Sequence, residues 1–338
     1  MNLTDPKYAK FALVQEMMQT VQTVKQFNPA QTKEVSKTIQ EIGRLFLTGE
    51  GSSRIFPAKN AIRKALTWGM DLSVSTDGSR QSAQYDLSKF AVFCASNSGR
   101  TKEVVLLAKK LKEKGHRNCF GLCANTGTML EEECRKTWVL QCGWEQAVAA
   151  TKSVVEQTLF YESILWNILG KDKSAELAKL PALIEQALSL PIPKEITDYA
   201  VKAQTIYFAG YNDGVAEELT LKTNEITRKK SDYLEGTYAA HGIEEVMDPN
   251  DLVIIVDPIE EEILKFQEVL AKGVGLKLVA IADRDTPFAT IRIPSAGEFK
   301  PYVLLCAGWN LLIEIGLAKG INLDKPERAR KVGNELIL

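Results

Sequence analysis

The sequence is poor in the residues that most often bind metals. Among its 338 residues there are only two histidines, His116 and His241, and its six cysteines form no Cys-x-x-Cys pair. Because zinc sites in proteins are built from closely spaced Cys and His side chains, we expect no metal site. Most of the cysteines lie within apolar, strand-like runs, which favours reduced thiols in a cytoplasmic protein.

The common signatures of nucleotide cofactors are also missing. The sequence contains neither Gly-x-Gly-x-x-Gly nor Gly-Lys followed by Ser or Thr, so we expect no dinucleotide, no nucleoside triphosphate and no other cofactor. The 42 basic and 43 acidic side chains give a net charge of -1. A nearly neutral chain has no general attraction for nucleic acid or for an anionic membrane, and neither is expected as a partner.

Long apolar runs and a leader are absent as well. The first six residues lack the basic patch and apolar stretch of a signal peptide. No run approaches the roughly 18 apolar residues of a membrane span. These features predict a cytoplasmic location.

What the sequence does contain is an alternation of strands and helices that occurs twice. Amphipathic helices are predicted at 8–27 and 30–42. After them, predicted strands alternate with predicted helices. The strands are expected at 45–48, 90–95, 118–123, 205–209, 252–256 and 278–282. Gly49 and Gly210 end corresponding strands 161 residues apart, and Ser96 and Asp257 have the same separation. A constant offset indicates a duplicated α/β domain with a mainly parallel sheet.

A loop rich in small polar residues follows the strand at 90–95. It reads Ser96-Asn97-Ser98-Gly99-Arg100-Thr101 and opens a predicted helix. A helix N-terminus offers unpaired N–H groups, and Gly99 lets the backbone approach a ligand closely. A single helix cap would need only one such residue. The pattern therefore favours a phosphate monoester site at the carboxyl end of the strand.

The matching loop of the second half has different chemistry. It reads Asp257-Pro258-Ile259-Glu260-Glu261-Glu262, and its four carboxylates would repel phosphate. We therefore expect only the first half to bind phosphate.

Candidate acid–base residues lie in the second half. Glu218, Lys222 and Glu225 are spaced to share one face of a predicted helix. That spacing is also typical of a solvated surface face bearing ion pairs. His241 before a glycine and Lys331 in a charged tail are each, taken alone, ordinary structural or solvated residues.

The order of these motifs resembles the sugar isomerase (SIS) family in its double-domain form. The first half matches at Gly51-Ser52-Ser53, at 96–101, and at Gly143-Trp144-Glu145 with Val148-Ala149-Ala150-Thr151-Lys152. The second half matches at Leu221-Lys222-Thr223-Asn224-Glu225, at His241-Gly242, and from Asp324 to Lys331. The chain looks like the isomerase half of glucosamine-6-phosphate synthase and its stand-alone relatives.

The resemblance implies two SIS domains, each a three-layer sandwich with a flavodoxin-like sheet between helices. It places a helical segment at 1–35, SIS domains at 36–170 and 201–320, a helical linker at 171–200, and an active-site tail at 321–338. By resemblance the protein binds a hexose or hexosamine 6-phosphate and moves a proton between C1 and C2, as an isomerase or as an aminosugar-phosphate deaminase.

The resemblance also assigns roles to individual residues. Glu225 is the implied proton-transfer base, His241 assists ring opening from a second subunit, and Lys331 closes over the substrate. This makes a homodimer with the active site at the interface the expected assembly. The implied phosphate ligands are Ser53, Ser96, Asn97, Ser98 and Thr101. The implied sugar contacts are Ser52, Glu145, Val148, Ala150, Glu218 and Lys222.

The sequence departs from the family pattern around the histidine and at one serine. The family has Gly-Glu-x-x-His-Gly-Pro, whereas this chain has Thr237-Tyr238-Ala239-Ala240-His241-Gly242-Ile243 and carries Ala150 in place of the serine. A fructosamine-6-phosphate deglycase and a non-catalytic phosphosugar sensor therefore stay as alternatives. Glutamine-dependent synthesis is not expected, since that enzyme needs Cys at position 2 and this chain has Asn2.

Overall fold

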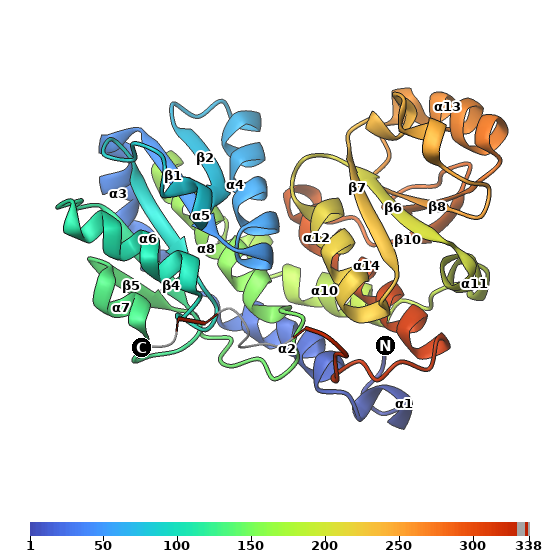
Figure 1. The fold of residues 1–338 in the computed structure, drawn as a ribbon, viewed down its shortest axis with the longest axis horizontal. Coiled ribbons are helices and arrows are strands. Elements are labelled where there is room, and N and C mark those ends of the chain that lie inside the picture. The colour runs from blue at the N-terminus through green and yellow to red at the C-terminus, as the bar shows by residue number, and fades with distance from the viewer. Residues whose placement is uncertain (330–334, 337–338) are drawn as a thin grey trace. The chain divides into compact units, whose positions relative to one another are not determined.

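A computed structural model describes residues 1–329, 335 and 336, and it contains two five-stranded parallel sheets (Figure 1). The strands of the first sheet are β1 (Arg44–Gly49), β2 (Ser73–Gly78), β3 (Ala91–Ala95), β4 (Cys119–Cys123) and β5 (Lys136–Val139). The strands of the second sheet are β6 (Thr205–Gly210), β7 (Lys230–Glu235), β8 (Leu252–Val256), β9 (Lys277–Ala282) and β10 (Ala289–Arg292).

The two sheets have the same topology, which confirms the predicted duplication. The first runs β2-β1-β3-β4-β5 and the second, read from its other edge, runs β7-β6-β8-β9-β10. All adjacent strands pair in parallel, and this order is the flavodoxin-like one. The order of strands reverses between β1 and β3, and between β6 and β8. Ligands of open α/β sheets bind at that point, beyond the carboxyl ends of the strands.

The chain forms two compact units, one around each sheet. The first-sheet unit comprises Gln22–Glu145 and Ala150–Lys179, and the described tail residues 335 and 336 belong to it. The second-sheet unit comprises Met1–Val21, Gln146–Ala149 and Leu180–Ala329. The first 21 residues therefore belong to the second-sheet unit, although the residues that follow them in the chain form the first-sheet unit.

Helices cover both faces of the first sheet because its buried strands carry apolar side chains on alternating sides. Val92 and Cys94 of β3 pack against apolar residues of α6 and α7. Phe93, between them in the chain, contacts Phe160 and Tyr161 of α8. The helices of this unit include α3 (Lys33–Ile42), α4 (Ile55–Thr67), α5 (Ser79–Ser82), α6 (Lys102–Glu113), α7 (Met129–Glu133), α8 (Lys152–Leu169) and α9 (Ser174–Leu177).

The second sheet is covered in the same way. Tyr207, Ala209, Val253 and Ile255 pack with Phe266 and Leu270 of α13 and the π-helical segment that continues it. A second group of helices packs around α14. The helices here include α1 (Pro6–Ala9), α10 (Leu180–Ser189), α11 (Lys194–Lys202), α12 (Val215–Lys222), α13 (Ile263–Phe266) and α14 (Lys300–Ala318); α2 (Ala12–Gln26) begins in this unit and ends in the other.

One expectation from the sequence is wrong. The segment Gly297–Ala318, which includes α14, is long and apolar enough to cross a membrane by length and composition, whereas no such stretch was expected. In the structure 83% of its most apolar window is buried within the protein. The run is apolar on all sides because α14 is a core helix, packed between the sheet and α10, α11 and α12.

Candidate active site

The serine-rich loop lies where the sequence predicted it, between the end of β3 and the start of α6. Its two ends are tied together, since the hydroxyls of Ser96 and Thr101 are 2.7 Å apart and the Thr101 amide donates to Ser96 Oγ at 3.3 Å. Asn97, Ser98 and Thr101 are each partly exposed, and Ser96 is buried. The loop thus presents small polar side chains at the N-terminus of a 12-residue helix.

Gly99 is needed for the shape of this loop. Its φ is +66°, in the left-handed region, and a Cβ added there would lie 2.4 Å from Cβ of Thr128. Thr128 caps α7 through a capping box with Glu131, and the amide of Leu130 donates to the carbonyl of Gly99 at 3.1 Å. A backbone hydrogen bond therefore holds the loop against α7, and the Thr128 side chain leaves no room for a Cβ at position 99.

The loop after β1 lies beside the loop after β3. A Cβ on Gly49 would meet the carbonyl oxygens of Ala95 and Ser53, each at 2.9 Å. Gln157 of α8 donates to the carbonyl of Ser53 at 2.5 Å. Ser52 is nearly buried and Ser53 is partly exposed. The structure therefore brings Ser53 to the same switch point of the first sheet as the loop at 96–101.

Glu145 connects this loop to the start of α8. Its side chain is fully buried. It accepts hydrogen bonds from the Thr151 amide at 2.7 Å, the Thr151 hydroxyl at 3.0 Å, Asn97 Nδ2 at 2.8 Å and the Ser153 hydroxyl. Both carboxylate oxygens are engaged by protein donors, so the geometry favours a positioning role over the sugar contact predicted for Glu145. Val148 and Ala150, on either side of Ala149, are partly exposed.

Two residues of the tail also contact the phosphate loop. Thr101 forms an antiparallel bridge with Glu335, and the amide of Leu336 donates to the carbonyl of Arg100 at 2.9 Å. Lys331 itself lies outside the described residues. The sequence did not predict that residues beyond Lys331 would bind the backbone of this loop.

The second-sheet unit carries the acid–base candidates. Lys222 Nζ lies 2.8 Å from Glu225 Oε2 and 3.3 Å from Glu218 Oε1. The side chains of Lys222 and Glu218 are 1% and 0% exposed, whereas that of Glu225 is 25% exposed. A solvated surface face, the alternative allowed by the spacing, is therefore wrong. Glu225 is the member of the group that solvent and ligands can reach.

The helix that carries these residues changes its winding at the site. The sequence predicted one regular helix, but α12 ends at Lys222 and a π-helical turn covers Thr223–Thr227. Glu225 lies within this turn and beside Lys222, three residues earlier, and Arg228 follows the turn with a left-handed φ of +54°. Single π-helical turns within helices are frequent at functional sites.

The charge of Lys222 is stabilised by its two partners. Burial alone would lower the pKa of Lys222, but the carboxylates of Glu225 and Glu218 outweigh it, and the pKa lies above its ordinary value. Lys222 therefore stays protonated and fixes the Glu225 carboxylate by charge and by a hydrogen bond.

His241 is exposed and contacts a different partner. Its Nε2 lies 2.8 Å from Lys265 Nζ of α13. Tyr238, Val246 and Leu264, which belong to the short helices around it, are 51%, 71% and 72% exposed.

The start of the tail is held by hydrogen bonds to two other segments, the start of α2 and Arg228, which follows Glu225 by three residues. Asp324 accepts from the amides of Ala12 and Leu13 at 2.8 and 2.9 Å and so caps α2. Arg228 donates to the carbonyl of Lys325 at 2.6 Å. The tail motif therefore begins with an aspartate that accepts hydrogen bonds from the start of α2.

The loop after β8, which corresponds to the phosphate loop, is filled by its own ion pairs. Asp257 has a left-handed φ of +51° and lies 3.2 Å from both Arg284 Nη1 and Lys300 Nζ. The two corresponding loops therefore differ in chemistry. In the loop after β8, a carboxylate of the chain itself pairs with the nearby cations. Sequence reasoning missed Arg284 and Lys300 because they come from distant segments.

Comparisons with known proteins agree with this geometry at the level of fold. No family model matches the chain. The glutamine–fructose-6-phosphate aminotransferase [isomerizing] of Neisseria meningitidis is 29% identical over 264 residues, which span 71% of this chain and 43% of that protein. The chain therefore spans less than half the length of this curated relative.

Solved structures cover nearly the whole chain. The C-terminal domain of glucosamine-fructose-6-phosphate aminotransferase from Francisella tularensis has a TM-score of 0.76 at 19% identity, over 94% of this chain and 98% of that one. Glucosamine-6-phosphate deaminase from Thermotoga maritima has a TM-score of 0.73 at 19% identity, over 96% and 98%. The chain thus has the α/β fold of SIS-domain structures and is similar in sequence to an isomerising aminotransferase of sugar phosphates.

Proposed function

We propose that the chain is a phosphosugar enzyme that transfers a proton between C1 and C2 of a hexose or hexosamine 6-phosphate. The reaction is aldose–ketose isomerisation, or isomerisation followed by release of ammonia from an aminosugar. The observation that carries the proposal is the partly exposed Glu225, held at 2.8 Å by a buried lysine in a π-helical turn. The similarity to proteins named for phosphosugar isomerisation and deamination supports it.

The phosphate is proposed to bind at the loop 96–101 with Ser53. Here the serine and threonine hydroxyls and the N-terminus of α6 supply donors. Asn97 is also a proposed phosphate ligand. Its Nδ2 donates a hydrogen bond to Glu145, which fixes the orientation of the Asn97 side chain before a ligand binds. Fixing the phosphate end of a sugar in advance lowers the entropic cost of bringing C1 and C2 to a base.

Glu225 is the proposed base. Its carboxylate takes the proton from one of the two carbons and returns it to the other, and an enediolate forms between the two steps. A permanent positive charge from Lys222 favours that anion. For a 2-aminosugar the same transfer gives a 2-imine, which water hydrolyses to ammonia and a 2-ketose. Each step balances without an oxidant or reductant.

The test is direct assay with glucosamine 6-phosphate, fructose 6-phosphate, tagatose 6-phosphate, galactosamine 6-phosphate and fructoselysine 6-phosphate. Ammonia or amine release is followed by a coupled reaction, and deuterium entry at C1 or C2 by NMR. Ammonia release supports a deaminase, deuterium entry without ammonia supports an isomerase, and amine release from fructoselysine 6-phosphate would point to a deglycase. Binding without any turnover would overturn the proposal in favour of a sensor.

Glu225→Gln separates catalysis from binding. It keeps the size of the side chain but removes the base, so turnover is expected to fall at least about 100-fold. The dissociation constant of the sugar phosphate, measured by calorimetry, is expected to change by less than about threefold, which corresponds to well under 1.4 kcal/mol. A variant that retains full turnover would exclude Glu225 as the base.

A further inference from the structure

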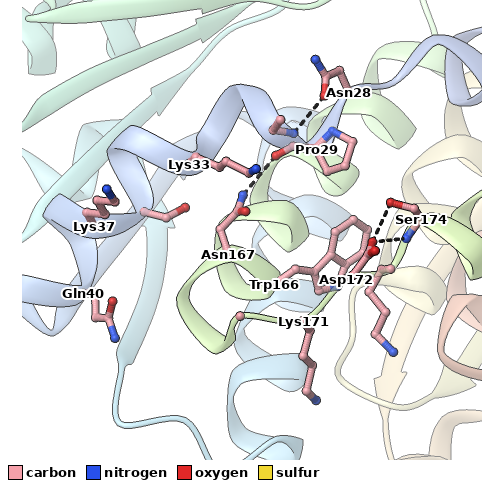
Figure 2. Close-up of a pocket in the computed structure, with 14 residues that line it drawn as sticks. Asn28, Pro29, Lys33, Lys37, Gln40, Trp166, Asn167, Lys171, Asp172 and Ser174 are labelled. Atoms are coloured by element: carbon pink, nitrogen blue, oxygen red, sulfur yellow. Dashed lines mark hydrogen bonds between the residues drawn. The ribbon is translucent and has the colours of Figure 1, made fainter.

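A cavity in the first-sheet unit lies away from the loop at 96–101. It has a volume of about 720 Å³ and is lined by α3, the turn before it, the end of α8 and the segment that follows α8 (Figure 2). None of the predicted site residues lines it. Its volume falls in the range of pockets that bind organic ligands of drug size.

One wall is the polar face of α3. Lys33, Ser36, Lys37 and Gln40 line the cavity, and their spacing places them along one side of the helix. The rest of the lining includes Asn167 at the end of α8 and Lys171 in the segment that follows it (Figure 2). Lys173 also lines the cavity. The lining residues include four lysines and one carboxylate, Asp172.

Hydrogen bonds from Ser174, and to a smaller extent the charge of Lys33, lower the pKa of Asp172, so this one carboxylate offsets part of the positive charge of the cavity. Asp172 accepts from the Ser174 amide at 2.9 Å and from the Ser174 hydroxyl at 2.6 Å. Lys173 pairs with Glu176 at 3.4 Å, and the ammonium of Lys171 lies 4.7 Å from the centre of the Trp68 ring. Lys33 and Lys37 form no ion pair with any described residue.

Helix electrostatics disfavour the positions of Lys33 and Lys37. Two like charges four residues apart on a helix repel one another. Lys33 is also the first residue of α3, where the helix dipole disfavours a cation. A bound anion would offset both costs, and the concave wall concentrates the positive potential.

The apolar part of the lining indicates an organic ligand. Pro29, Ala30 and the largely buried Trp166 supply carbon surface next to the lysines. We propose that this cavity binds a multiply charged organic phosphate, with the phosphates held by Lys33 and Lys37. This site is independent of the proposed sugar-phosphate site and of its reaction.

The probes are ADP and inorganic pyrophosphate, added to the full chain and followed by calorimetry at two salt concentrations. ADP is expected to bind at millimolar concentration or below and more weakly at higher salt. The double variant Lys33→Met with Lys37→Met is expected to bind ADP at least about tenfold more weakly. The matched control replaces Lys110 of α6 and Lys114, the residue after its end, which are both exposed and four residues apart, and is expected to bind as the wild type does.

A third variant separates this cavity from the phosphate loop. Ser96→Ala is expected to leave ADP binding unchanged while weakening binding of the sugar phosphate. The proposal is overturned if ADP does not bind, if the Lys33 and Lys37 double variant binds it as well as the wild type, or if Ser96→Ala removes its binding. Stronger binding of pyrophosphate than of ADP would contradict the proposal that the apolar lining binds the organic group of the ligand.

Discussion

At the scale of single residues, Lys222 is the charge on which the acid–base group depends. It is 1% exposed and has two carboxylate partners, of which Glu218 is fully buried. Lys222→Met would remove the cation that both carboxylates share. Removing one partner of a buried pair typically costs about 3–5 kcal/mol, so a marked fall in the free energy of unfolding is expected in urea titrations.

The double variant Lys222→Met with Glu218→Gln is the control for this prediction. It removes one of the two carboxylates that pair with Lys222 and should recover part of the lost stability. Equal unfolding midpoints for the wild type and Lys222→Met would show that the ion pairs contribute nothing.

The same lysine predicts how stability depends on alkaline pH. The folded pKa of Lys222 is raised above its ordinary value of 10.5 by Glu225 and Glu218, against the effect of burial. Its contribution is therefore complete below the unfolded pKa and is lost as the pH rises through the folded pKa. Unfolding free energies measured from pH 8 upward should fall more steeply above about pH 10.4 for the wild type than for Lys222→Met.

Substitution of Gly99 tests whether the shape of the phosphate loop depends on the absence of a side chain, and Gly127 is the control. Gly99 and Gly127 have φ values of +66° and +68°, but a Cβ would clash with Thr128 only at Gly99, since nothing lies within 4 Å of Gly127. Gly127→Ala should cost about 1 kcal/mol from backbone strain alone. Gly99→Ala should lower the melting temperature further and weaken sugar-phosphate binding at least about tenfold. Equal effects of the two substitutions would mean that the contact with Thr128 does not shape the loop.

At the scale of elements, Glu145 joins the phosphate loop to the N-terminus of α8. Glu145→Gln places an amide group among four donors, so at least one hydrogen bond to Asn97, Thr151 or Ser153 is lost. We expect the KM for the sugar phosphate to rise with less effect on kcat.

Glu156→Gln is the matched control. Glu156 is also buried and accepts from the amides of Gln141 and Cys142 at 2.8 and 2.7 Å. Burial raises its pKa. This variant should change the melting temperature but leave the KM unchanged. A raised KM in both variants would indicate general loosening of α8 instead of a specific effect on Asn97.

The elements also show what the sequence could and could not predict. The strands β1, β3, β6 and β8 were found because buried strands are short, apolar and followed by polar loops, and the offset of 161 residues revealed their pairing into two similar halves. The π-helical turn at Thr223–Thr227 was not found, because its residues also fit a regular helix. The ion pairs of Asp257 were missed because Arg284 and Lys300 follow it by 27 and 43 residues.

At the scale of the whole molecule, the proposed homodimer rests on the surface around His241. Tyr238, Val246 and Leu264 are exposed there by 51%, 71% and 72%, beside a histidine that contacts Lys265. Scattered apolar residues are normal on protein surfaces, but several large ones in neighbouring short helices are typical of an interaction site. We therefore expect this surface to contact a second copy of the chain.

Leu264→Asp tests that expectation against Leu66→Asp. The two leucines are similarly exposed, at 72% and 76%, but Leu66 lies on α4 of the first-sheet unit. A buried carboxylate at an interface would be desolvated, so Leu264→Asp should shift the protein from dimer to monomer in light scattering, while Leu66→Asp should stay dimeric. If His241 acts on the partner's substrate, turnover should fall together with the dimer fraction and recover at high protein concentration. A Leu264→Asp protein that is monomeric yet fully active would show that His241 does not serve a second subunit, and a wild type that is monomeric would remove the dimer altogether.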